Sequence, residues 1–190
     1  MVNRMGKVRR SQAGAMLIEF ALTVSLFLLL VLAIMEFVLL LFDMSRANEM
    51  TRQITRLAIT ADPVCDIWAG SCGGSGAPGL TCPGGSPVIV DLSQVDTSAP
   101  SGSDRGPTGY RMLQSAQQFL PDVQSNQIRV TYSCSDTGNP LRPQPIPLVT
   151  VALQNYSRPF VVGSFLGIGA SFNMPAFEVT RIGEDLYTEG

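Results

Sequence analysis

Residues 20–42 read FALTVSLFLLLVLAIMEFVLLLF, and this stretch decides the fold. As an α-helix it is roughly 34 Å long, at about 1.5 Å per residue, which is enough to cross the hydrocarbon core of a bilayer. A removable secretory signal has a shorter apolar stretch of about 7–15 residues, followed by small residues at a cleavage site. The sequence therefore predicts a retained membrane helix that contacts lipid.

Basic residues on both sides of this helix bear on its orientation. Lys and Arg close to a span favour the cytoplasmic side, and the shorter flank is the harder one to translocate. The N-terminal flank is short and its first fourteen residues contain no acidic residue, so we expect it to stay in the cytoplasm of a bacterial cell, with the rest of the chain outside the inner membrane. The basic residues are Arg4, Lys7, Arg9 and Arg10 before the span and Arg46, Arg52 and Arg56 after it.

The overall charge argues against nucleic acid as a partner. The chain has 13 basic and 15 acidic residues. Without the four basic residues of the N-terminal flank, nine basic residues face fifteen acidic ones. A protein that binds nucleic acid needs a surplus of cations to neutralise phosphates, and the outer part of this chain has the opposite surplus.

The membrane helix is predicted to continue outward as far as Asp62 and Pro63. The stretch DMSRANEMTRQITRLAITA contains no helix breaker, and apolar residues recur in it at spacings of three and four. Such an apolar stripe has to pack on something. Two coverings are open: the chain's own outer domain, or the helix of a neighbouring subunit. The stripe consists of Ala47, Met50, Ile54, Leu57 and Ala61.

The outer part of the chain predicts a small antiparallel sheet, so the fold class is α+β, with a long helix leading into a pilin-like domain. The expected divisions are a basic leader at 1–14, the helix at 15–62 and an outer domain at 63–190 with a Gly/Pro/Ser-rich loop at 69–109. Alternating apolar residues and a short amphipathic segment define its elements. We expect strands at 88–92, 127–134, 146–156 and 172–182, a helix at 110–120, and a short helix or loop at 160–168.

Four cysteines lie on the expected outer side of the membrane, where disulfides can form. Four cysteines allow three pairings. We favour Cys65–Cys72 or Cys65–Cys82 as the bond that closes the Gly-rich loop, with Cys134 tying a strand to it. A zinc site is the weaker alternative, because the chain has no histidine and no paired C-x₂-C spacing.

The same lack of histidine removes the usual general base of hydrolases, and no catalytic residue is predicted. The glycine-rich runs CGGSGAPG and CPGGSP lack the lysine of a phosphate-binding loop. No metal or other cofactor is expected. The sequence thus favours a structural or binding protein over an enzyme.

One motif stands at the inner border of the span. Residues 9–20 read RRSQAGAMLIEF, in which Glu19 lies at the mouth of an apolar helix. A carboxylate there is tolerated at headgroup level, but deeper placement costs about 2.5–3.5 kcal/mol on insertion scales unless it finds a partner. A charge at the membrane boundary with no further role is the plainer interpretation of Glu19.

The motif resembles the class III signal that prepilin peptidases cut, and the resemblance places cleavage between Gly14 and Ala15. It implies that Glu19 pairs with the new N-terminus of a neighbouring subunit and so sets the stagger between subunits. The longer stretch from Gly14 to Ile59 resembles the TadE-like pseudopilins of the tight-adherence (Tad) pilus. Partners implied by this family are other pilin subunits, the prepilin peptidase and an inner-membrane assembly platform.

Glu36 is a second acid within the apolar stretch, and the TadE-like pattern also has an acid late in the span. It lies six residues before Phe42, or about 9 Å along a helix. An acid at that depth should face a polar partner, either between helices or between subunits. The proline that often follows the Glu-Phe pair in the family is missing here, since no proline precedes Pro63.

Three functional hypotheses follow. The first is a minor pilin or pseudopilin that helps to assemble or prime a Tad-type pilus used in adhesion. The second is a membrane-anchored adhesin or binding module outside the cell membrane. The third is a single-span periplasmic protein that is never processed. Processing after Gly14 separates the third from the others.

Overall fold

The structure is a computed structural model. It describes residues 5–68, 72, 79–80, 82, 85–100, 105–135, 146–167 and 169–183, and it describes side chains from residue 14 onward. Its elements form two compact units. The helix unit comprises Met1–Leu41 and Pro159–Phe172, and the sheet unit comprises Phe42–Arg158 and Asn173–Gly190.

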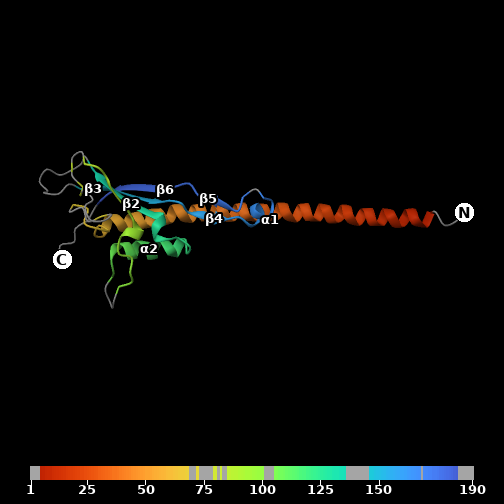
Figure 1. The fold of residues 1–190 in the computed structure, drawn as a ribbon, viewed down its shortest axis with the longest axis horizontal. Coiled ribbons are helices and arrows are strands. Elements are labelled where there is room, and N and C mark those ends of the chain that lie inside the picture. The colour runs from red at the N-terminus through yellow and green to blue at the C-terminus, as the bar shows by residue number, and fades with distance from the viewer. Residues whose placement is uncertain are drawn as a thin grey trace. The chain divides into compact units, whose positions relative to one another are not determined.

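The first element is α1, a continuous helix at Met5–Thr60 (Figure 1). No proline interrupts it, and the first proline of the chain, Pro63, follows soon after its end. Polar hydroxyls inside the apolar stretch are satisfied locally, because Thr23 Oγ1 and Ser25 Oγ each donate to the carbonyl oxygen four residues earlier, at 2.8 Å. The predicted continuation of the helix beyond the apolar stretch is confirmed.

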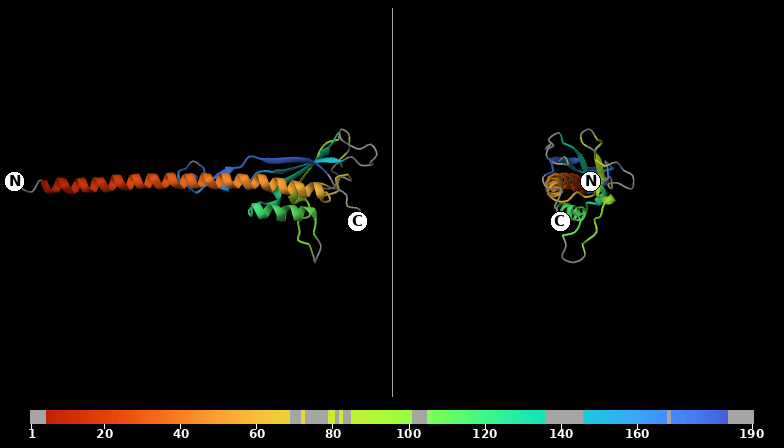
Figure 2. Two further views of the ribbon diagram at one scale, coloured as in Figure 1. Left: turned by 180° about the vertical axis from the view of Figure 1, so that it is seen from behind. Right: turned by 90° about the vertical axis from the view of Figure 1, so that its left-hand side faces the viewer.

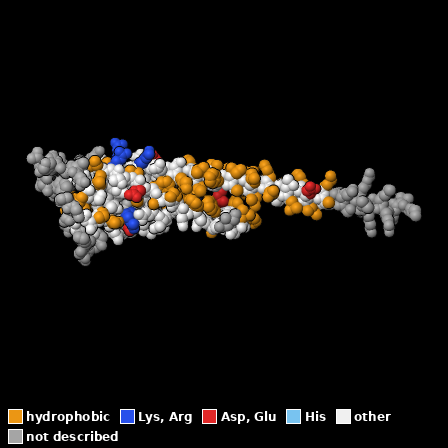
Figure 3. Space-filling model, turned by 90° about the horizontal axis from the view of Figure 1, so that it is seen from above, with side chains coloured by type: hydrophobic (Ala, Val, Ile, Leu, Met, Phe, Trp, Pro, Cys, Tyr) orange, Lys and Arg blue, Asp and Glu red, His pale blue; other side chains and the backbone are white. Residues whose placement is uncertain are grey.

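Within the described residues, Gly14–Thr60 is long and apolar enough to cross a membrane. Its large apolar side chains up to Phe42 are mostly exposed, Met16 at 73% and Leu26 at 70%, for example. In the space-filling view, hydrophobic side chains cover this part of the helix (Figure 3). A helix that is apolar on all sides and unburied by its own chain suits a lipid or protein environment.

The sheet unit contains a four-stranded antiparallel sheet in the order β1-β2-β3-β6. The register places Val130 opposite both Val90 and Val151, and Val151 opposite Val179. The α+β class and the antiparallel sheet are confirmed. The strands are β1 at Val88–Asp91, β2 at Ile128–Cys134, β3 at Pro147–Leu153 and β6 at Phe177–Ile182.

Short helical segments complete this unit. The predicted helix at 110–120 is α2, at Thr108–Phe119, and Pro107 precedes its first residue. It buries Met112 and Ala116 and is followed by the buried Leu120. Two 3₁₀ turns lie beside the strands, η1 at Leu92–Gln94 and η2 at Ser125–Gln127.

The apolar stripe on the outer part of α1 is covered by the chain's own sheet unit. Ala47, Met50 and Ile54 are each 0% exposed. Figures 1 and 2 show this part of α1 running beside the sheet, with α2 along another of its sides. The inward-facing residues of β2 and β3 complete the core, and they include Val130, Tyr132, Val149 and Val151. Of the two coverings left open by the sequence, the chain's own domain is therefore the observed one.

The predicted single strand at 172–182 is wrong. The structure divides it into β5, at Ser171–Asn173, and β6, and the two belong to different sheets. Pro175 lies in the break and has no amide hydrogen for a ladder bond, which explains the interruption. β5 pairs with β4, at Ser157–Pro159, a strand that the sequence analysis missed. β6 does occupy an edge of its sheet, as expected for a segment next to a proline.

Candidate functional sites on the apolar helix

The inner end of α1 carries the predicted processing site. Gly14, Ala15 and Glu19 are all exposed on the helix. A Cβ added at Gly14 would meet no atom within 4 Å. The helix face on which a side chain at position 14 would lie is thus free of contacts with the described residues. The predicted leader covers residues 1–14, and its basic side chains are not among the described side chains.

Glu19 is the only charged residue between Gly14 and Met35. Its neighbours are large apolar side chains, among them Ile18 at 65% and Phe20 at 67% exposure. Among the residues whose side chains are described, its carboxylate has no ion-pair or hydrogen-bond partner. A carboxylate in such apolar surroundings gains from any cation that a second molecule supplies.

Glu36 has a different environment. Its carboxylate accepts hydrogen bonds from the backbone N–H of Val161 and from that of Val162, the latter at 3.1 Å. These two amides open α3, a short helix at Val161–Phe165. The first N–H groups of a helix have no partner inside the helix and carry a partial positive charge, so a carboxylate satisfies them well. The predicted role of Glu36 between subunits stays a prediction, and its contacts in this structure lie within its own helix unit.

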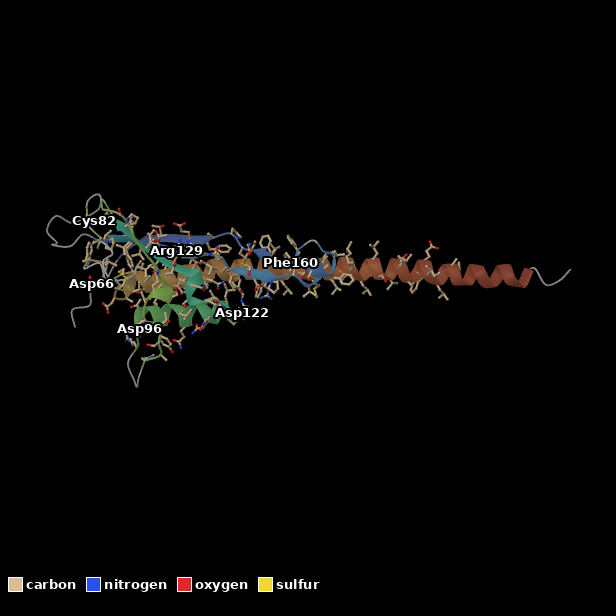
Figure 4. The ribbon with its side chains drawn as sticks, viewed as in Figure 1. Asp66, Cys82, Asp96, Asp122, Arg129 and Phe160 are labelled. Atoms are coloured by element: carbon tan, nitrogen blue, oxygen red, sulfur yellow. A yellow bond between two sulfur atoms is a disulfide. The ribbon has the colours of Figure 1, made fainter. Side chains whose placement is uncertain are left out.

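The segment that supplies these amides is a closed loop, which we call the apolar loop (residues 160–170). The Phe160 N–H donates to the Ala170 carbonyl at 2.8 Å and joins its two ends. The centroid of the Phe160 ring lies 6.0 Å from that of the Phe172 ring, and Figure 4 labels Phe160. Gly163 allows a close crossing inside the loop, because an added Cβ would lie 2.8 Å from the Gly169 carbonyl oxygen. The predicted short helix or loop at 160–168 is thus a helix within a loop.

In the sheet unit, Asp43 forms an ion pair that the sequence analysis missed. Its side chain is only 8% exposed, and Arg158 Nε lies 3.1 Å from Asp43 Oδ2. The two groups are not aligned as a hydrogen bond, so the attraction is chiefly between charges. Nearby, burial raises the pKa of Tyr156, and the negative charges of Asp43 and Asp122 raise it further. No local pattern links residues so far apart in sequence, which is why the pair was not predicted.

The four cysteines form two disulfides, Cys65–Cys72 and Cys82–Cys134. The first is one of the two bonds that the sequence favoured for closing the Gly-rich loop, and the second ties strand β2 to that loop. Cys82 is labelled in Figure 4. Among the described residues, no group of three or more His, Cys, Asp or Glu side chains is placed to hold a metal ion.

An open hollow on the sheet unit is rich in arginine. Arg52 and Arg56, one helical turn apart on α1, line it together with Arg181 of β6. No acidic residue is among the described side chains that line it, so it suits anions better than cations. No motif in the sequence pointed to this hollow.

Comparison with protein families supports the N-terminal resemblance. Residues 14–56 match the family described as TadE-like protein. No curated protein and no solved structure matches the chain. The matched segment begins at the predicted processing site and contains both Glu19 and Glu36. The N-terminal helix of the chain is therefore similar to TadE-like proteins over residues 14–56, in agreement with the resemblance seen in its sequence.

Proposed function

We propose that the protein is a minor pilin or pseudopilin of a Tad-type pilus, matured by a prepilin peptidase after Gly14. The observation that carries the proposal is Glu19, a carboxylate on an exposed apolar helix without a partner among the described side chains. It lies five residues after Gly14, where an added Cβ would meet no atom within 4 Å. The TadE-like match to residues 14–56 supports involvement in the Tad pilus system.

Cleavage after Gly14 would release the basic leader and leave a new α-amino group at Ala15. In the proposed assembly, this ammonium pairs with Glu19 of a neighbouring subunit. Each charge is costly in apolar surroundings when alone, and pairing removes most of that cost. Because the pair forms at only one stagger of the two helices, its main effect is on the register of the assembly.

The exposed apolar surface of α1 fits this role, since a pilin helix leaves lipid to pack among other helices. The outer sheet unit is then displayed at the assembly's surface, where it supports adhesion. A structural role also fits the family, whose members are not enzymes. The alternative function is a membrane-anchored adhesin or periplasmic binding module that keeps residues 1–14.

The test is the N-terminus of the protein purified from membranes of cells that contain a prepilin peptidase. Intact mass and N-terminal sequencing should show a chain beginning at Ala15. We expect Glu19→Ala to be cleaved normally but to abolish incorporation into pili, because the register pair is lost. Glu49→Ala is the matched control, since Glu49 is an exposed acid on the same helix.

Two results would contradict the proposal. A wild-type chain that retains Met1 in the presence of the peptidase would exclude processing and favour the anchored binding module. Normal piliation by Glu19→Ala would exclude the register pair even if cleavage occurs.

A further inference from the structure

The apolar loop exposes large hydrophobic side chains to an unusual degree. Val161 is 79% exposed, Phe165 84% and Leu166 44%. Among described residues outside α1, only Ile89 and Ile182 are also large, apolar and exposed to this degree. Exposed apolar groups that cluster within six residues mark an interaction surface more often than scattered ones do.

This surface is held in a fixed shape. The Phe160–Ala170 hydrogen bond, the close crossing at Gly163 and the contact between Phe160 and Phe172 close the loop on itself. Gly167 has a φ of +69°, a conformation in which a side chain is strained. Phe165 is therefore exposed by a loop whose backbone is held in one conformation.

The loop is attached to the membrane helix through Glu36. Both N–H groups that Glu36 accepts from lie in the first turn of α3. The apolar side chains of α3 are thus held beside an apolar part of α1 in the same helix unit. Segment 159–172 has no charged residue, and Ser164 and Ser171 are its only polar side chains. The segment therefore offers few side-chain groups that could bind water or a charged partner.

The length of α1 leaves room for this arrangement at the membrane boundary. Residues 15–35, like residues 20–42, form a helix long enough to span the hydrocarbon core, at about 32 Å, and this placement puts Glu19 near the inner boundary of the core. Glu36 then lies at the outer interface, where a hydrogen-bonded carboxylate is tolerated. Residues 37–41, which are all apolar, would lie at or above the headgroups, in the same helix unit as the apolar loop.

We propose that the apolar loop is a second membrane contact, which inserts Val161, Phe165 and Leu166 into the outer-leaflet lipid at the level of Glu36. The bound partner is the acyl-chain region of a phospholipid surface. The apolar surface of the loop is continuous with that of the membrane helix. The loop also has no charged group that would lose its hydration on insertion. This inference requires that α1 cross the bilayer, but it does not require processing or pilus assembly.

The test uses the full chain in phosphatidylcholine vesicles with one tryptophan as a depth reporter. The natural Trp68 is replaced by Phe, which removes no described hydrogen bond because the indole N–H has no acceptor among the described residues. Phe165→Trp then reports on the loop. Ile89→Trp, at an exposed site on β1 of the sheet unit, is the matched control.

We expect the emission of the Phe165→Trp protein to shift to shorter wavelength in vesicles. Lipids brominated near the headgroup should quench it more than lipids brominated near the chain end, and aqueous iodide should quench it little. The Ile89→Trp protein should show the opposite pattern, with strong quenching by iodide and none by bromine. Adding Glu36→Ala to the Phe165→Trp protein should reduce the quenching by brominated lipid, because the loop loses its attachment.

Two results would overturn the proposal. Equal iodide quenching of the two reporters would place the loop in water. Shielding of the Phe165→Trp reporter from both iodide and brominated lipid would show that protein, such as a second copy of the chain, covers the loop. Neither result bears on cleavage after Gly14, so failure here is distinct from failure of the proposed function.

Discussion

The two parts of α1 differ in what surrounds their apolar side chains. From Gly14 to Leu41 its large side chains are mostly exposed, whereas from Phe42 to Thr60 one side is buried by the sheet unit. The acids follow the same division. Asp43 has Arg158 as its counter-ion within the sheet unit, while Glu19 has no partner among the described side chains. The first part thus needs an environment that other molecules supply, and the second part obtains it from its own chain.

Glu36 lies between these extremes. Its carboxylate is hydrogen-bonded, but by backbone amides and not by a cation. A carboxylate that accepts hydrogen bonds from its own chain stabilises the fold. A carboxylate without such a partner is available to a second molecule. This difference distinguishes Glu19 from Glu36, two of the four acids in the segment that matches the TadE-like family.

The largest expected effect on stability tests the division of α1 directly. Ile54→Ala should lower the free energy of unfolding of the sheet unit by about 2–5 kcal/mol, because it removes a fully buried side chain and leaves a cavity. Leu26→Ala, at a site 70% exposed, should leave that free energy unchanged. Guanidinium unfolding in detergent, followed by Trp68 fluorescence, measures both. Equal effects of the two variants would remove the distinction between the two parts of the helix.

A smaller effect is expected at Asp43. Arg158→Ala leaves a carboxylate of 8% exposure without its cation, and breaking a buried pair typically costs about 3–5 kcal/mol. Because the Arg158 side chain is 37% exposed and partly screened by water, we expect about 1–3 kcal/mol in the same unfolding assay.

Two further variants check this interpretation. Asp43→Asn combined with Arg158→Ala should recover part of the lost stability, since no buried charge then remains. Glu49→Ala, which removes an exposed acid bonded only to Gln53 within the same helix, should change the unfolding free energy by less than about 0.5 kcal/mol. A double variant no more stable than Arg158→Ala would show that the charge of Asp43 is not the cause.

The smallest expected effect concerns the end of α1. Tyr132 Oη accepts a hydrogen bond from the Val64 N–H at 3.1 Å, just after the helix ends. Tyr132→Phe should cost about 1 kcal/mol, because it removes this bond and leaves the N–H without its acceptor. Thermal unfolding by circular dichroism measures the loss. An unchanged unfolding temperature would mean that water replaces the hydroxyl without cost.

The same residue predicts a pH dependence. Burial raises the pKa of Tyr132 from 10 to about 12. Above pH 10 the unfolded chain releases this proton while the folded chain keeps it, so the unfolding free energy should fall as the pH rises from 10 toward 12. The fall should be smaller in Tyr132→Phe, and the difference between the two proteins between pH 9 and pH 11 isolates this residue. Parallel pH profiles would contradict the burial of an ionisable hydroxyl.

Much of the fold followed from local patterns in the sequence. The apolar stretch, the spacing of the stripe that ends near Ala61, and the alternation in β2 and β3 are signals carried by neighbouring residues. Burial of Ala47, Met50 and Ile54 is confirmed, although the sequence alone could not decide which surface covers them. An amphipathic stripe predicts that its residues are buried, but it does not identify the surface that covers them.

The failures involve contacts between distant residues. Glu36 and Val161 are 125 residues apart, and the groups that bind the carboxylate are backbone amides, which any sequence possesses. Asp43 and Arg158 are similarly remote. The single strand expected at 172–182 failed because its alternation continues across Pro175, while the backbone there cannot pair. The disulfide pairing stayed open for the same reason, since spacing alone does not bring two cysteines together.

The burial of the outer part of α1 also determines when the sheet unit can fold. One side of its core is made of α1 residues that leave the ribosome before β6 does. Residues 42–60 must therefore be helical before the strands have a surface on which to close. Formation of the helix is in this sense the first folding step of the sheet unit, and a chain that lacked residues 42–60 would lose the side of the core that Ala47, Met50 and Ile54 form.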